Sequence, residues 1–149
     1  MEEGLKFVIS GSMSAAQTET ATLHFLEEYM PVLNATCPDA ALVITGRNPS
    51  RRILDSSARY NNIKVIPNPE DLTAEVIKGN YYICPLHTGG GLKLRCMDAL
   101  RVGLPILAHK MSTRGYEAIQ ADGYLFSYST PGEFAEALQK ITAIHGSHA

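Results

Sequence analysis

The residues of this chain best suited to chemistry gather in one short stretch, where three consecutive glycines, Gly89–Gly91, precede a helical pattern. A short apolar run, Tyr81–Cys84, ends at Pro85 just before them. The helical pattern begins with two cations, Lys93 and Arg95, and its first turn holds no acidic residue. A helix N-terminus is partially positive, so each cation there is unfavourable by ~0.3–1 kcal/mol. A bound anion would reverse this cost, so the stretch predicts a cradle for a phosphate or diphosphate.

Plainer interpretations of the same residues stay open. Lys93 and Arg95 would also suit a solvated surface, where most lysines and arginines lie. Asp98 could form an ion pair with Arg95 one turn earlier. The glycines, Gly89–Gly91, could form an irregular turn with positive φ. His87 lies in the same loop, but a lone histidine is more often incidental than functional.

Other kinds of site lack support in the sequence. No serine sits in a nucleophile elbow, and no Gly-x-Gly-x-x-Gly follows the first apolar run, which argues against a hydrolase triad and a dehydrogenase. The cysteines, Cys37, Cys84 and Cys96, are odd in number and lack metal-ligand spacing. We therefore expect reduced structural thiols, no bound metal and no cofactor.

Size and charge narrow the class of protein. A chain of 149 residues with 45% hydrophobic residues is long enough for one domain with a real core. Its net charge of −2 gives no electrostatic reason to bind nucleic acid. The apolar runs are far shorter than the roughly 20 residues of a membrane span, and no signal peptide precedes Leu5. We expect a cytoplasmic domain, or one peripheral to the membrane in a full-length protein.

Short apolar runs alternate with amphipathic stretches along the chain. The apolar runs predict strands at Leu5–Ser10, Ala41–Thr45, Ile63–Ile66, Tyr81–Cys84, Pro105–Ala108 and Tyr124–Ser127. The amphipathic stretches predict helices at Thr18–Leu33, Ser50–Ser57, Glu70–Lys78 and Gly91–Val102, a helical turn near Tyr116–Ile119, and a final helix after Thr130.

Local sequence sharpens two of these helices. Pro31 should kink the first helix or start its last turn, because proline has no N–H to donate. Thr130, Pro131 and Glu133 predict a capped start for the final helix. The inward-facing residues of that helix should be Phe134, Ala137, Leu138 and Ile141.

This alternation predicts an α/β fold: a Rossmann-like, doubly wound parallel sheet of about six strands, with helices on both faces. The order of the strands stays open. In such folds ligands bind beyond the carboxyl ends of the strands. The loops expected there are Gly11–Gln17, Gly46–Pro49, Pro67–Pro69, Leu86–Leu92, His109–Gly115 and the loop at Ser129.

Three segments in this order, Ile9–Met13, Val43–Pro49 and Cys84–Pro105, resemble the donor-binding half of group 1 (family 4-like) retaining glycosyltransferases of the GT-B fold. The third is the most specific, with Gly-Gly-Gly before its helix and Gly-Leu-Pro after it. The resemblance implies a two-domain enzyme whose C-terminal half binds a nucleoside-diphosphate sugar without a metal. Residues 1–149 would form that half, and the N-terminal acceptor-binding domain would be a partner missing from this chain.

The resemblance also implies roles for individual residues. Gly11 and Ser12 would approach the diphosphate or sugar, and Gly46 and Arg47 would border the nucleotide, although Arg47 equally suits a surface turn. Pro67 would lie near the base, and Lys93 and Arg95 would stabilise the leaving diphosphate. Asp98 stands where the family usually has a ribose-binding glutamate, and Gly90 replaces an earlier glutamate. The candidate substrate-binding residues are Gly11, Ser12, Gly46, Arg47, Pro67, His87, Thr88, Gly89, Gly90, Gly91, Leu92 and Asp98.

Three functional hypotheses follow. The first is the donor domain of a glycosyltransferase of hexosyltransferase type, inactive by itself. The second is a stand-alone, non-catalytic module that binds a nucleotide or nucleotide sugar. The third is part of a GT-B enzyme that epimerises a nucleotide sugar.

Overall fold

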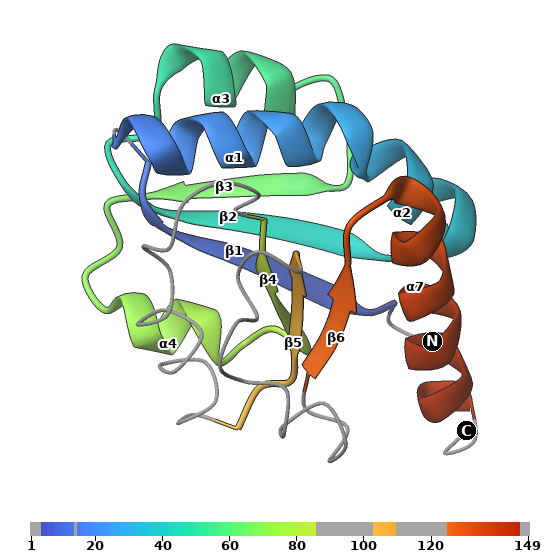
Figure 1. The fold of residues 1–149 in the computed structure, drawn as a ribbon. Helices are drawn as coiled ribbons and strands as arrows, with labels where there is room; N and C mark the ends of the chain where they lie inside the picture. Colours follow the sequence, from blue (N-terminus) through green and yellow to red (C-terminus); the bar gives the residue numbers. More distant parts are fainter. Residues whose placement is uncertain (1–3, 14, 86–102, 110–124, 147–149) are drawn as a thin grey trace.

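The computed structural model describes residues 4–13, 15–85, 103–109 and 125–146, and its strands form one parallel sheet (Figure 1). The sheet order is β3-β2-β1-β4-β5-β6. This confirms the predicted α/β fold and supplies the strand order that the sequence left open. The strands are β1 (Lys6–Ser12), β2 (Ala41–Arg47), β3 (Ile63–Pro67), β4 (Tyr81–Cys84), β5 (Ile106–His109) and β6 (Leu125–Tyr128).

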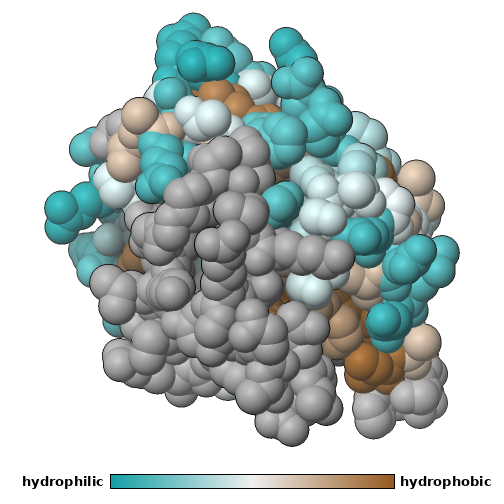
Figure 2. Space-filling view, viewed as in Figure 1, coloured by the Kyte–Doolittle hydropathy of each residue, from teal (hydrophilic) through white to brown (hydrophobic). Residues whose placement is uncertain are grey.

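Helices cover both faces of the sheet (Figure 1). One face carries α1, α2, α3 and α7, and the other carries α4. The outer side of α3 is mostly hydrophilic in Figure 2, as expected for a helix that faces solvent. The helices are α1 (Ala16–Glu28), α2 (Met30–Thr36), α3 (Arg51–Ser57), α4 (Leu72–Val76) and α7 (Pro131–Gly146).

Side chains along each strand point alternately to the two faces of the sheet, so the core consists of two clusters. Phe7 and Ile9 of β1 join the larger cluster under α1, α2 and α7, whereas Val8 joins the smaller one on the opposite face. Phe134 and Leu138 of α7 are fully buried in the larger cluster, as the sequence predicts. Burial on both faces is typical of a parallel sheet and gives it a fixed register.

Pro31 starts a new helical segment, which agrees with the second of its two predicted effects better than with a kink. The continuous helix predicted over Thr18–Leu33 is two helices, because α1 ends at Glu28 and α2 begins at Met30, with Pro31 in its first turn. A proline there avoids the loss of an internal hydrogen bond. The separate α2 then packs against α7.

The caps of two other helices also refine the prediction. Thr130 Oγ1 accepts a hydrogen bond from the Glu133 amide at 3.1 Å, which confirms the predicted start of α7. The Glu133 carboxylate accepts from the Ser129 amide at 2.8 Å, one residue before Thr130. Helix α4 is shorter at both ends than the predicted Glu70–Lys78, and its start is fixed by Asp71, which accepts from the Ala74 amide at 3.1 Å.

The helix predicted over Gly91–Val102 and the turn near Tyr116–Ile119 lie outside the described residues. Within the ranges that are described, no helix combines the length and the hydropathy that a membrane span requires.

Candidate functional site

The strand order places a topological switch point between β1 and β4. From β1 the chain builds outward through β2 and β3, and from β4 it builds the opposite way through β5 and β6. Open α/β sheets bind ligands at this point, beyond the carboxyl ends of the two central strands. β1 ends there with Gly11 and Ser12, and β4 ends with Cys84, followed by Pro85. The structure therefore brings the first predicted contact loop to the edge from which the triglycine loop departs.

Gly11 and Gly46 lie directly opposite each other in the paired register of β1 and β2. Their φ angles are 142° and 152°, a range that side-chain-bearing residues rarely adopt. A Cβ atom on Gly46 would overlap the carbonyl oxygen of Gly11. Both glycines therefore have a structural reason to be glycine, in addition to the predicted closeness to a ligand.

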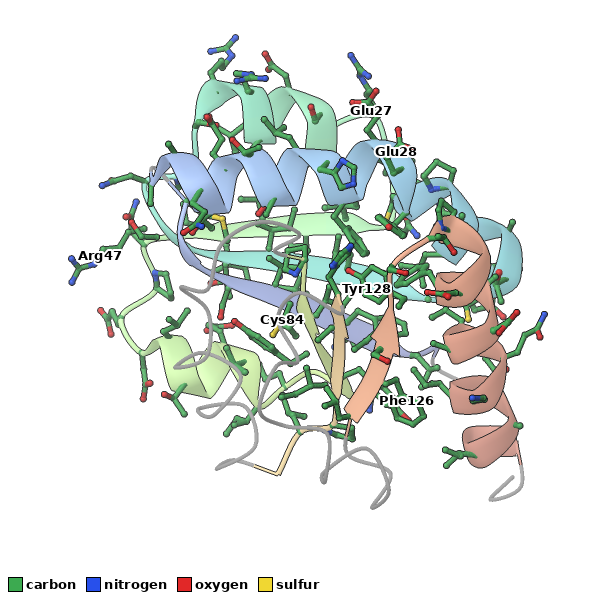
Figure 3. The ribbon with its side chains drawn as sticks, in the orientation of Figure 1. Glu27, Glu28, Arg47, Cys84, Phe126 and Tyr128 are labelled. Carbon is green, nitrogen blue, oxygen red and sulfur yellow. The ribbon has the colours of Figure 1, made fainter. Side chains whose placement is uncertain are left out.

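Arg47 is exposed, and its side chain points away from the sheet (Figure 3). Its backbone carbonyl accepts a hydrogen bond from the Met13 amide at 2.9 Å, which ties the end of β1 to the end of β2. The backbone of Arg47 thus shapes the edge. The predicted contact of its guanidinium with the nucleotide stays a prediction.

The loops that follow β2 and β3 are tied to each other. The Asn48 amide donates to Asn68 Oδ1 at 3.1 Å, and the Asn68 amide donates to the Gly46 carbonyl at 2.8 Å. Both asparagines have φ near +50°, a conformation that asparagine tolerates better than most residues. Pro67, the predicted neighbour of the base, ends β3 opposite Gly46 and is therefore held at the same edge.

Sequence reasoning missed two residues at the switch point. Ser10 and Tyr82 are both buried, and their hydroxyl oxygens lie 2.7 Å apart across β1 and β4. The only visible sign was a serine inside an apolar run, since Tyr82 reads as an ordinary strand residue. The two asparagines, Asn48 and Asn68, were visible only as turn residues.

A buried aromatic group occupies the ends of β5 and β6. Tyr128 is fully buried, and its ring centroid lies 5.5 Å from that of His109 and 4.9 Å from that of Tyr29. Burial, followed by the neighbouring Tyr29 and Cys84, raises the pKa of Tyr128 well above its usual value. The phenol is therefore neutral at ordinary pH and serves packing rather than acid–base chemistry.

No group of three or more potential metal ligands (His, Cys, Asp or Glu) occurs among the described residues. The remaining predicted site residues lie outside those residues: Lys93, Arg95, His87, Thr88, Gly89, Gly90, Gly91, Leu92 and Asp98. The phosphate cradle itself stays a prediction.

Solved structures share this fold at low sequence identity. The glycosyltransferase GlyE of Streptococcus pneumoniae TIGR4 is 17% identical with a TM-score of 0.59, and the match covers 94% of this chain and 33% of that one. A UDP-forming α,α-trehalose-phosphate synthase of Burkholderia xenovorans is 11% identical with a TM-score of 0.64, covering 92% and 36%. S. aureus MnaA, solved with UDP, is 13% identical with a TM-score of 0.56, covering 94% and 36%.

These likenesses confirm the Rossmann-like fold found in GT-B glycosyltransferases. The chain spans about a third of the length of each of the three proteins. A search of curated protein sequences gave no match. The sequence family described as glycosyl transferases group 1 matches residues 4–143, almost the whole chain. The chain therefore belongs to the group 1 glycosyl transferases.

Proposed function

We propose that this chain is the donor-binding domain of a glycosyltransferase that moves a sugar from a nucleoside diphosphate to an acceptor. Two observations carry the proposal. The chain belongs to the group 1 family, and its switch point lies between Gly11–Ser12 and Pro85, which follows β4. The likeness to the UDP complex of MnaA and to a UDP-forming synthase supports a nucleoside diphosphate as the ligand.

In this proposal the domain contributes leaving-group stabilisation. The amides of Gly89–Leu92 and the side chains of Lys93 and Arg95 hold the diphosphate, whose negative charge grows as the glycosidic bond breaks. Groups that are preorganised for this developing charge lower the barrier more than groups that bind the ground state alone. Fixed cations and a helix N-terminus would do this work, so we expect no metal requirement.

The described edge supplies the other walls of the proposed donor site. Gly11 and Ser12 would face the diphosphate, and Pro67 would face the base. Because the Asn68 amide already donates to Gly46, it is not free to read the base. We expect base contacts near Pro67 to come from other backbone groups.

The acceptor site would belong to a separate domain, in line with the short span of this chain relative to its structural neighbours. The isolated chain should then bind the donor nucleotide and transfer sugar poorly or not at all. In the full-length protein the activity would be of hexosyltransferase type.

Calorimetry with UDP, GDP and ADP tests the proposal directly. We expect one of the three to bind clearly more tightly than its own nucleoside, because the diphosphate carries the interaction with the cradle. The nucleosides serve as matched controls that lack only the phosphates. A folded sample that binds none of the three nucleotides would contradict the proposal.

A further inference from the structure

The end of β1 is supported unequally by its two neighbouring strands. Its register with β2 continues to the last residue of the strand, where Ser12 pairs with Arg47. Its register with β4 comprises Phe7 opposite Tyr81 and Val8 opposite Tyr82. In the register of the described residues, the pairs of β1 with β4 therefore end at Val8, whereas its pairs with β2 continue to Ser12.

A side chain of β4 reaches this end of β1. Tyr82 stands opposite Val8, but its phenolic oxygen lies 2.7 Å from Ser10 Oγ, two residues further along β1. The same phenol lies 3.4 Å from the Ser10 carbonyl oxygen, to which its O–H can donate. Tyr82 is 3% exposed and Ser10 is 7% exposed, so water competes little for these hydrogen bonds.

The bridged residue directly precedes the proposed contact loop. Ser10 is followed by Gly11, which has a φ of 142° and no side chain to anchor it. The position of Gly11 therefore depends on the residues that contact its neighbours. On the β2 side, the Met13 amide and the Arg47 carbonyl hold this turn. On the β4 side, Tyr82 holds it through Ser10. Because side chains alternate along a strand, Ser12 lies on the same face of the sheet as Ser10.

From this geometry we infer that Tyr82 is a positioning residue, which acts through Ser10 to set where Gly11 and Ser12 stand relative to the exit of β4. This inference rests on the proposed function, because it matters for activity only if a diphosphate binds between these two segments. It assigns Tyr82 no contact with substrate. Its effect should therefore fall on recognition of the diphosphate and leave nucleoside recognition unchanged.

The test compares Tyr82→Phe with Tyr81→Phe in the whole chain. Both variants lose one hydroxyl from adjacent residues of β4, but the side chain of Tyr81 lies on the opposite face, stacked on Phe7. Calorimetry would measure the affinity for UDP, GDP and ADP and for the matching nucleosides. We expect Tyr82→Phe to weaken binding of the preferred nucleoside diphosphate roughly 3- to 10-fold, the effect of about one hydrogen bond. We expect Tyr81→Phe to change it little.

A double-mutant cycle identifies the partner. Ser10→Ala removes the contact between the two hydroxyls but leaves the Ser10 carbonyl as an acceptor for Tyr82, so it should also weaken binding of the diphosphate. The double variant should lose less than the sum of the two single losses, because both substitutions remove the contact between the hydroxyls. Thermal unfolding of each variant would confirm that it is native during the titration. If Tyr82→Phe does not fold, Ser10→Ala removes the hydrogen bond between the two hydroxyls and decides the question.

The outcomes separate this inference from the proposed function. A wild-type chain that binds no nucleotide would overturn the proposed function, and this inference with it. A wild-type chain that binds while Tyr82→Phe binds equally well, or weakens diphosphate and nucleoside to the same extent, would overturn the inference alone. An equal loss in Tyr81→Phe would also overturn it.

Discussion

Gly46 faces Gly11 so closely across β1 and β2 that a methyl group on Gly46 would occupy the space of the Gly11 carbonyl oxygen. The obstacle is backbone rather than a flexible side chain, so it cannot rotate away. A substitution must therefore separate the two strands at the edge where ligands are expected to bind. Strain of this kind is among the few causes of large destabilisation by a single substitution.

Gly46→Ala should lower the free energy of unfolding by about 2–4 kcal/mol, measured by urea denaturation, since it combines a backbone collision with an unfavourable φ. Gly132→Ala is the matched control, because its Cβ would meet only Thr130 Oγ1, at 3.9 Å. That change should be neutral or stabilise by up to about 1 kcal/mol. Equal free energies of unfolding for the two variants would show that β1 and β2 can move apart at this edge without loss of stability.

Tyr128→Phe should leave stability unchanged or raise it by about 1 kcal/mol. The Tyr128 hydroxyl is buried and has no hydrogen-bond partner among the described residues, so the native state carries the cost of its desolvation. Tyr60→Phe provides the contrast, because the Tyr60 hydroxyl donates to the Leu26 carbonyl at 3.3 Å. It should lower stability by about 0.5–1.5 kcal/mol. A clear loss in Tyr128→Phe would reveal a partner for that hydroxyl.

The same phenol predicts how stability depends on alkaline pH. Burial raises the pKa of Tyr128 in the folded state, whereas in the unfolded chain it titrates near 10. Above that pH the unfolded state binds fewer protons than the native state, so the free energy of unfolding falls as pH rises. Denaturation between about pH 9 and pH 11 should show this fall. Its slope should be smaller in Tyr128→Phe, by at most about 1.4 kcal/mol per pH unit.

Tyr29 and Tyr81 also have raised pKa values because they are buried, so part of the alkaline loss should persist in Tyr128→Phe. An identical slope in the variant and the wild type would exclude Tyr128 as a contributor. A loss of stability below pH 9 would have to come from groups other than these tyrosines.

Replacing both Lys93 and Arg95 with alanine should weaken binding of the preferred nucleoside diphosphate about 10- to 100-fold, the effect expected when charge-assisted contacts are lost. Binding of the nucleoside should change little. Alanine at both Arg59 and Lys64, an exposed pair of cations, is the control for a general change in charge. Equal losses for nucleotide and nucleoside would remove the proposed leaving-group role.

Hydrophobic runs predict most of this fold because burial on both faces of a parallel sheet leaves a strong imprint on sequence. The bounds of β4 agree residue for residue. The predicted first strand stops at Ser10, two residues before β1 ends, because Gly11 and Ser12 have low strand propensity and extend the strand by pairing with Gly46 and Arg47. That pairing is a long-range contact, which local pattern does not reveal.

The site was predictable to a smaller extent. Gly11, Gly46 and Pro67 lie at the predicted edge because loops after parallel strands must collect there. The link between Ser10 and Tyr82 joins residues 72 positions apart and depends on the strand order, so no local spacing could indicate it. Likewise, the role of Asn68 depends on which loop lies beside it, and propensity marked it only as a turn residue.

The hydrogen bonds that join Asn48, Asn68 and Gly46 affect how a ligand could bind at this edge. A movement of either loop away from the other would have to break these hydrogen bonds. A base docking beside Pro67 would therefore meet loops whose ordering entropy was partly lost when the chain folded. We expect selectivity there to depend on the shape of the two joined loops more than on their closure around the base.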